Sequence, residues 1–223
     1  MLPWVQLGTA TVPGGGQLRL MQRGTEFCIM AGREPLMNSR LSGSEEELAT
    51  LAWARISGRK NAQILIGGLG MGFTLRAALA AMPFDTRIVV AELVPEIVVW
   101  ARGPLASLFD SCLEDRRVTL EITDVGRLIA SADASFDAIL LDVDNGPEGL
   151  SRDGNDRLYA HAGLAAAKRA LRPGGVLAIW SSHTDEKFTR RLADAGLRTE
   201  ELRVRARHDG KGARHTIWMA VRP

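Results

Sequence analysis

The segment after residue 141 carries an unusual concentration of small polar side chains. Its sequence is Asp142-Val-Asp-Asn-Gly-Pro147, and it directly follows the apolar residues 139–141. The Asn-Gly-Pro part is typical of a turn, but a turn does not require the preceding aspartates. A carboxylate at the end of a buried strand can orient an ammonium group or accept a proton from a nucleophilic amine. We therefore predict that Asp142 is the catalytic residue of a site.

Three glycines at alternate positions follow a second short apolar run. The run covers residues 64–66, and the glycines are Gly68, Gly70 and Gly72. Glycine can adopt backbone angles that bring a turn close to a ligand, and a helix after the turn directs free N–H groups at that ligand. A purely structural glycine turn is the alternative, because this motif alone has low specificity.

Two acidic residues stand where a nucleoside can be held. Glu92 ends a predicted strand about twenty residues beyond the glycine turn, where a carboxylate can accept hydrogen bonds from both ribose hydroxyls. A solvated strand end is the alternative for Glu92. Asp124 follows the next strand, and it could accept a hydrogen bond from an adenine amino group or cap the following helix. Their neighbours Leu93 and Val125 complete the predicted nucleoside-binding set.

The elements that must position these residues alternate between strand and helix from residue 61 onward. Strands are predicted over 64–66, 87–92, 118–122, 138–142 and 176–180. Helices are predicted over 74–81, 96–105, 125–130 and 158–171. Such alternation predicts a doubly wound, Rossmann-like α/β domain whose parallel sheet is covered by helices on both faces.

The chain after residue 181 adds one helix and two strands. The helix is predicted over 186–195 and the strands over 199–205 and 216–221. A link this short makes the two strands antiparallel, because a parallel return needs a longer crossover. We therefore expect a mostly parallel seven-stranded sheet that ends in an antiparallel hairpin.

The first part of the chain does not show the alternation of strands and helices that begins at residue 61. Residues 17–22 and 26–31 form a predicted hairpin, and a helix begins near Ser44. The glutamates Glu45 to Glu47 fit the first turn of that helix, where negative charge is favourable, although direct contact of one of them with a substrate is the alternative. We therefore divide the chain into a β-rich extension with its linking helix, residues 1–58, and an α/β domain, residues 59–223.

The composition limits the classes of partner. Lys and Arg total 28 and Asp and Glu total 26, so no large charge surplus is available for nucleic acid or an anionic membrane. Two distant cysteines, no signal-peptide pattern and no long apolar run favour a cytoplasmic location. The four histidines form no metal-ligand spacing with the cysteines, and we expect no metal.

The order of these motifs resembles the spermidine synthase (polyamine aminopropyltransferase) family. The matching segments, which cover roughly residues 60–182, are Gly-Gly-x-Gly-x-Gly-x-Thr-Leu-Arg, Val-Ala-Glu-Leu-Val-Pro, Asp-Arg-Arg-Val, Phe-Asp-Ala-Ile-Leu-Leu-Asp and Leu-Arg-Pro-Gly-Gly. The resemblance implies a class I methyltransferase-like fold that transfers an aminopropyl group from decarboxylated S-adenosylmethionine to a small amine. It also implies that Glu92 holds the ribose, Asp124 the adenine and Asp142 the reacting amine.

Three departures from the family pattern leave other functions open. Met71 stands where the family has an aspartate that holds the donor ammonium, Asn145 replaces a second aspartate with Asp144 displaced by one residue, and Ser44-Glu-Glu-Glu47 stands near the place of a Tyr-His-Glu segment. The co-substrate is therefore S-adenosylmethionine or its decarboxylated form. The alternatives are a methyltransferase acting on a small nucleophile and a non-catalytic, adenosyl-nucleoside-binding regulatory protein.

Five residues form the predicted acceptor-binding set: Asp144, Asn145, Tyr159, Ser181 and His183. Ser181 and His183 follow the fifth predicted strand, although helix capping by their neighbours explains that segment equally well. Tyr159 matches an aromatic that the family places near its substrate, and a core position is its alternative. We expect a small-molecule acceptor and a homodimer.

Overall fold

The predicted α/β fold is confirmed by the computed structural model, which describes residues 2–143, 157–207 and 212–223. Its main sheet has the strand order β10-β11-β9-β8-β5-β6-β7. The strands are β5 (Gln63–Gly67), β6 (Arg87–Glu92), β7 (Val118–Ile122), β8 (Phe136–Leu141), β9 (Leu171–Ser181), β10 (Arg198–Arg205) and β11 (Arg214–Val221). Strands β5 to β9 are parallel, and β11 pairs antiparallel with both β9 and β10. The strand order reverses beside β5, between β6 and β8.

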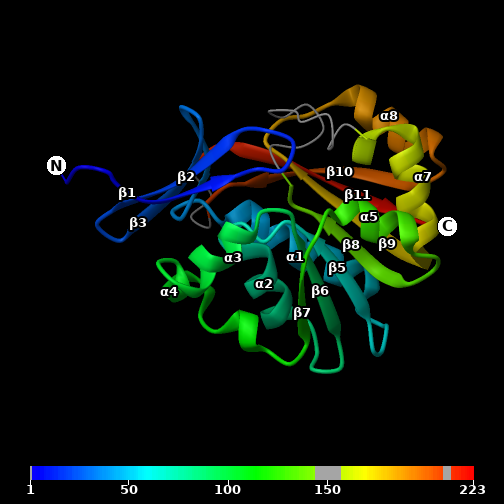
Figure 1. Cartoon of the computed structure of the whole chain (residues 1–223). Helices are drawn as coiled ribbons and strands as arrows, with labels where there is room; N and C mark the ends of the chain where they lie inside the picture. Colours follow the sequence, from blue (N-terminus) through cyan, green and yellow to red (C-terminus); the bar gives the residue numbers. More distant parts are fainter. Residues whose placement is uncertain (1, 144–156, 208–211) are drawn as a thin grey trace.

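Helices cover both faces of this sheet (Figure 1). Ile64 and Ile66 of β5 belong to one core cluster, which also contains residues of α2 (Phe73–Ala81) and α3 (Pro95–Arg102). Leu65, between them, belongs to a second cluster on the opposite face. That cluster includes residues of α5 (Val125–Ser131), α7 (His161–Ala170) and α8 (Glu186–Asp194). A strand buried on both faces explains the continuous apolar run in the sequence.

The N-terminal extension is a four-stranded antiparallel sheet in the order β1-β2-β3-β4. The predicted hairpin corresponds to β2 (Gln17–Arg23) and β3 (Glu26–Ala31), whereas β1 (Val5–Thr11) and β4 (Glu34–Asn38) were not predicted. Strand β4 contains Pro35, which cannot donate a ladder hydrogen bond, and β4 lies at the edge of the sheet, where proline is tolerated. Strand β1 is mostly exposed, and its apolar residues Val5 and Leu7 face solvent.

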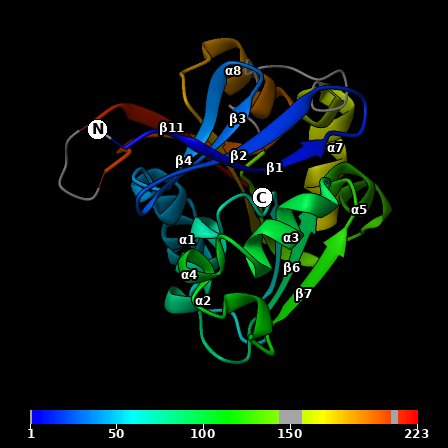
Figure 2. The same cartoon turned by 60° about the vertical axis from the view of Figure 1, so that its left-hand side comes forward.

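Helix α1 (Gly43–Ile56) connects the two sheets and packs against α2, β8 and β9. Its buried stripe includes Leu48, Ala52 and Ile56, as the helical spacing predicts. Strand β1 lies beside α3 (Figure 2), and a Cβ on Gly8 would lie 2.7 Å from the Trp100 indole nitrogen. The division of the chain near residue 58 stays a prediction.

Two helix boundaries differ from the predictions. Helix α3 ends at Arg102, and a short α4 (Ala106–Phe109) follows it after a turn. Helix α7 begins at His161, and β9 already begins at Leu171 because Leu171 is fully buried and pairs with Phe136. The ladder then shifts register before Val176 pairs with Ala138, which accommodates the intervening Pro-Gly-Gly segment.

Asp137 ties together the amino-terminal ends of these strands. It is 2% exposed, and its carboxylate oxygens lie 2.6 Å from Arg59 Nη1 and 2.7 Å from Arg172 Nη1. The backbone N–H of Gln63, at the start of β5, donates to the same carboxylate at 2.7 Å. A buried carboxylate is tolerated here because two cations and a backbone donor compensate for its lost hydration.

We expect Asp137→Asn to lower the free energy of unfolding by about 2 kcal/mol, because it leaves two arginines and a backbone donor with a neutral amide. Urea denaturation at neutral pH measures this change. Asp133→Asn, an exposed position nearby, is the control and should leave the midpoint unchanged. An unchanged midpoint in Asp137→Asn would show that the cluster does not contribute to stability.

Candidate active site

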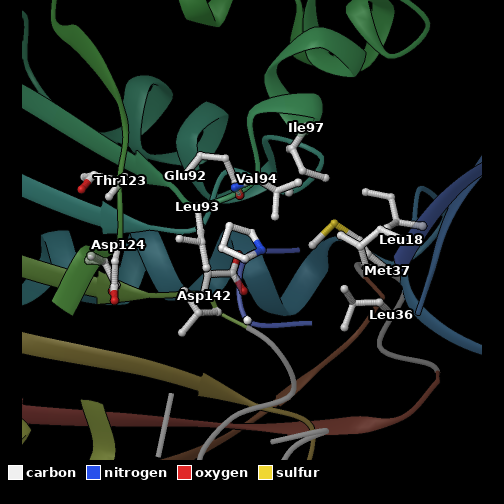
Figure 3. A pocket seen from close by; sticks show the side chains of 18 of the residues that line it. Leu18, Leu36, Met37, Glu92, Leu93, Val94, Ile97, Thr123, Asp124 and Asp142 are labelled. Carbon is white, nitrogen blue, oxygen red and sulfur yellow. Dashed lines mark hydrogen bonds between the residues drawn. The ribbon is translucent and has the colours of Figure 1, made fainter. Parts of the chain in front are cut away.

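A cavity of about 690 Å³ lies beyond the carboxyl ends of the parallel strands. Open α/β sheets bind ligands in this position, where the strand order reverses. Figure 3 shows Leu18, Leu36 and Met37 of the N-terminal sheet on one side and Thr123 and Asp124 on the other, with Asp142 between them. The cavity is therefore built by both sheets.

The glycine turn forms the part of the cavity nearest to β5. Gly68 has φ +90°, and a Cβ there would lie 2.4 Å from the Asp142 carbonyl oxygen. Gly70 has φ +51°, and its Cβ would lie 2.7 Å from Met37 Cε. Both glycines line the cavity. Gly72 does not line it: this residue precedes α2, and a side chain there would collide with Phe109.

Glu92 lies at the end of β6, against the glycine turn. It is 7% exposed and lines the cavity together with Leu93. The Leu69 N–H donates to Oε2 at 2.9 Å, and the Val94 N–H donates to Oε1 at 2.8 Å. Burial raises the pKa of Glu92, while these backbone donors act in the opposite direction. Each oxygen keeps a lone pair with which it can accept a hydroxyl from a ligand.

Asp124 caps α5, and it also lines the cavity. Its Oδ1 accepts a hydrogen bond from the Gly126 N–H at 2.7 Å, so the capping interpretation is confirmed. Asp124 and Val125 both border the cavity beside Thr123. Capping occupies one carboxylate oxygen, and a contact between Asp124 and adenine stays a prediction.

Asp142 directly follows β8 and borders the cavity. The hydroxyl of Thr74, in the first turn of α2, donates to Asp142 Oδ2 at 2.7 Å. Loss of water around the carboxylate raises the pKa of Asp142 to about 6, although the Thr74 hydrogen bond lowers it. Thr74 carries no distinctive signal in the sequence, because a threonine near a helix start is common.

Glu45 is the site residue that the sequence did not distinguish from its neighbours. It is 7% exposed and borders the cavity, whereas Glu46 lies 3.9 Å from Arg76 and Glu47 is exposed. Successive helical residues point in different directions, so only one member of such a triplet can face a given site. The acidic triplet itself was the available signal.

The Glu45 carboxyl is held by a hydrogen-bond chain that runs through Ser44 of the same helix to β11. The Ser44 hydroxyl donates to Glu45 Oε2 at 2.6 Å, and Ser44 Oγ lies 2.8 Å from His215 Nδ1 on β11. Burial, followed by the Asp142 carboxylate, raises the pKa of Glu45 to about 7. Two carboxyls with raised pKa values therefore border the same cavity, a pattern that is enriched at functional sites.

Three of the predicted acceptor-binding residues, Tyr159, Ser181 and His183, are not part of the cavity lining. Tyr159 is 2% exposed and packs edge-to-face on Phe188 in the core, with ring centroids 5.6 Å apart. Ser181 is buried at the end of β9 and accepts the His183 N–H at 3.2 Å, while His183 is exposed. None of these three residues lines the described cavity. Asp144 and Asn145 lie outside the described residues.

Met71 does not face the cavity either. Its side chain is fully buried, and its backbone N–H donates to Met37 Sδ at 3.2 Å. Across from the carboxyls, the wall is apolar and includes Leu18, Ile29 and Leu36. In the part of the chain that the structure describes, no lysine or arginine lines the cavity.

Other features of the described residues concern cysteines, metals and membranes. Cys28 and Cys112 are free and buried. Within residues 2–143, 157–207 and 212–223, no three His, Cys, Asp or Glu side chains gather in a way that could hold a metal ion. The described helices include none with the length and apolar character required to cross a bilayer. The expectation of no metal stays a prediction.

Comparisons with solved structures agree with the observed fold. A spermidine synthase from Thermotoga maritima superposes with a TM-score of 0.76 at 15% identity, over 98% of this chain and 73% of that one. A spermidine synthase in complex with the transition-state analogue AdoDATO gives a TM-score of 0.76 at 16% identity, over 98% and 72%. A precorrin-6y C5,15-methyltransferase from Geobacter metallireducens gives 0.53 at 19% identity, over 78% and 87%. These similarities establish the fold alone.

Sequence comparisons are more specific. A polyamine aminopropyltransferase of Nitrosomonas europaea is 33% identical over 117 residues, which are 52% of this chain and 34% of that protein. The polyamine aminopropyltransferase of Mycobacterium tuberculosis is 30% identical over 137 residues, 58% of this chain and 24% of that protein. The chain thus spans 34% and 24% of the lengths of these two relatives. The sequence model of the spermine/spermidine synthase domain matches residues 43–190. This chain therefore belongs to the spermine/spermidine synthase domain family.

Proposed function

We propose that this protein transfers an aminopropyl group from decarboxylated S-adenosylmethionine to a small amine. The observation that carries the proposal is the convergence of Asp142, Glu92 and the glycine turn on one cavity. The relatives named polyamine aminopropyltransferase support it. They do so for the matched part only, because the chain spans 34% and 24% of their lengths.

Each residue has a separate task in this mechanism. Glu92 accepts the ribose hydroxyls, Asp124 accepts the adenine amino group, and Gly68 and Gly70 let the backbone approach the nucleoside. Leu93 and Val125 border the same part of the cavity. Asp142 orients the acceptor amine.

The transfer itself is a displacement at carbon. Asp142 accepts one proton from the acceptor ammonium, and the resulting neutral amine attacks the propyl carbon bonded to sulfur. The new N–C bond forms as the C–S bond breaks, and the bonding pair moves to sulfur, which leaves as the neutral thioether methylthioadenosine. Catalysis of such a step is mainly alignment of the nucleophile, the carbon and the leaving sulfur.

One observation favours methyl transfer as the second candidate. Met71 gives the glycine turn no carboxylate, and its side chain is buried away from the cavity. If S-adenosylmethionine is the donor, a nucleophile of the acceptor attacks the methyl carbon of the same sulfonium instead. The comparisons give no support to the non-catalytic alternative.

We further propose a small-molecule acceptor, a homodimer, a cytoplasmic location and no bound metal. The near-balance of 28 basic and 26 acidic residues supports a small acceptor over nucleic acid or an anionic membrane. The free state of both cysteines fits a reducing compartment.

Calorimetric titration distinguishes the two donors. We expect decarboxylated S-adenosylmethionine to bind more tightly than S-adenosylmethionine, because carboxylates border the cavity and no described cation lines it. Methylthioadenosine, the product, serves as the reference ligand. Tighter binding of S-adenosylmethionine would favour methyl transfer, and failure of all three nucleosides to bind the folded protein would refute the enzyme function.

Asp142→Asn should reduce turnover at least a hundredfold, the usual loss when a general base is removed. The amide keeps an oxygen that can accept the Thr74 hydroxyl, so methylthioadenosine affinity should change little. Product formation with a panel of small amines, together with calorimetry, measures both effects. Asp133→Asn is the exposed control, and undiminished turnover in Asp142→Asn would remove Asp142 from the mechanism.

Asp142→Asn should also change how stability depends on pH. The pKa of Asp142 is about 6 in the folded protein, above the value near 3.9 in an unfolded chain. Between these values the folded state binds more protons, so the contribution of Asp142 to stability falls as pH rises from about 4 to about 6. The asparagine variant does not titrate, so its free energy of unfolding should rise relative to that of the parent protein between about pH 4 and pH 7.5. We expect a rise of about 1 kcal/mol, less than full proton linkage would give, because the carboxyl is only partly buried.

Urea denaturation of both proteins at each pH measures this difference. The same difference at the two pH values would show that the Asp142 carboxyl is not destabilised by its surroundings.

A further inference from the structure

Glu45 and Asp142 are brought together by the first turns of two helices. Thr74, in the first turn of α2, donates to Asp142 Oδ2 at 2.7 Å, and its Oγ1 lies 3.2 Å from the Glu45 carbonyl oxygen in α1. The same threonine therefore contacts the residues that carry both carboxyls. Both residues border the cavity, and the charge of Asp142 raises the pKa of Glu45.

The position of Glu45 is fixed from the opposite side by the C-terminal hairpin. Ser44 links Glu45 to His215, and the His215 ring packs edge-to-face on Trp180 with centroids 4.9 Å apart. Trp180 borders the cavity, is 7% exposed, and its indole N–H has no hydrogen-bond partner in the described part of the chain. A buried donor without a partner beside two carboxyls indicates a region shaped to receive a polar ligand.

The two carboxyls also differ from Asp137 in how their charge is compensated. Asp137, which is 2% exposed at the start of β8, is paired with Arg59 and Arg172. Among the described residues, no lysine or arginine forms an ion pair with Glu45 or Asp142, and none lines the cavity. Two unpaired carboxyls in a partly dry cavity repel each other, and a cation placed between them relieves that repulsion.

We propose that Glu45 binds the ammonium group of the decarboxylated donor, beside Asp142, which orients the acceptor amine. Glu45 thus supplies from α1 the carboxylate that the glycine turn, with Met71, lacks. This inference rests on the proposed function and names the donor class: a nucleoside sulfonium whose side chain carries an ammonium but no carboxylate. The α-carboxylate of S-adenosylmethionine would be repelled by the same pair, which discriminates against it.

The interaction depends on the ionisation of the groups around the pair. Asp142 faces Glu45 from the end of β8, Glu46 raises its pKa from the same helix, and Ser44 links it to His215. Burial lowers the pKa of His215 and the nearby His183 lowers it further, which favours the neutral ring at neutral pH. As pH falls through about 7 and about 6, Glu45 and Asp142 take up protons and lose their attraction for an ammonium.

Calorimetry with two nucleosides isolates the ammonium contact. Decarboxylated S-adenosylmethionine carries the ammonium and methylthioadenosine does not, so the ratio of their affinities reports the contact itself. At about pH 8, Glu45→Gln should reduce that ratio roughly tenfold to a hundredfold, the range expected for one charge-assisted contact. The ratio in the parent protein should fall toward that of the variant at about pH 5.5.

Two further variants control for structural effects. Glu47→Gln removes an exposed charge from the same helical turn and should leave the ratio unchanged. Glu45→Asp retains the charge and should restore part of the ratio that Glu45→Gln loses. Thermal unfolding establishes that each variant is folded. Equal losses of affinity for both nucleosides in Glu45→Gln would overturn the proposal, because a general structural defect affects both ligands alike.

A readout without ligand separates this inference from the proposed function. Carbon-13 NMR titration of the side-chain carboxyls should show the Glu45 midpoint at lower pH in Asp142→Asn than in the parent protein, because the repelling charge of Asp142 is removed. An unmoved midpoint would refute the pair. If the parent protein binds neither nucleoside, the proposed function fails and the donor assignment fails with it, while the titration still decides whether the pair exists.

Discussion

The close approach of Gly68 to the Asp142 carbonyl determines the arrangement of the site. The Gly67 carbonyl accepts the Asp142 N–H at 3.0 Å, and the Gly68 N–H donates to the Ala91 carbonyl at 2.9 Å. These bonds hold the carboxyl ends of β5, β6 and β8 together. No side chain fits between Gly68 and Asp142, since a Cβ would lie 2.4 Å from the carbonyl oxygen. The turn can therefore place α2, and with it Thr74, against the Asp142 carboxylate.

The N-terminal sheet converts this strand edge into an enclosed cavity. Met37 of β4 lies over Gly70, where any larger residue would collide with its side chain. Leu18 and Ile29 bury apolar surface in the same core cluster as the central sheet, and this burial holds the wall in place. Helix α1 follows β4 directly, so the segment that docks the wall also delivers Glu45. The cavity wall and the position of the Glu45 carboxyl therefore depend on the same packing of the N-terminal sheet against the central sheet.

Local sequence patterns predicted the central architecture and the residues at the strand ends. Strands buried on both faces leave continuous apolar runs, and glycines at forced backbone angles leave a turn signal, so β5, Gly68, Glu92 and Asp142 could be found. Burial by distant elements leaves no such pattern. Glu45 could not be distinguished from Glu47 because the docking of α1, rather than its own sequence, decides which of them faces the cavity. The same reason explains why Tyr159, proposed for the substrate, belongs to the core under α8.

Asp137 and the pair formed by Glu45 and Asp142 show how one fold treats buried carboxyls in two ways. Asp137 is compensated within the chain by Arg59 and Arg172, so its charge contributes to the cohesion of the sheet. Glu45 and Asp142 receive side-chain hydrogen bonds from the hydroxyls of Ser44 and Thr74, and burial raises their pKa values. Their ionisation opposes folding, and a cationic substrate that pairs with them recovers that free energy as binding. A carboxyl pair that no described lysine or arginine neutralises is thus unfavourable for stability and favourable for binding an ammonium.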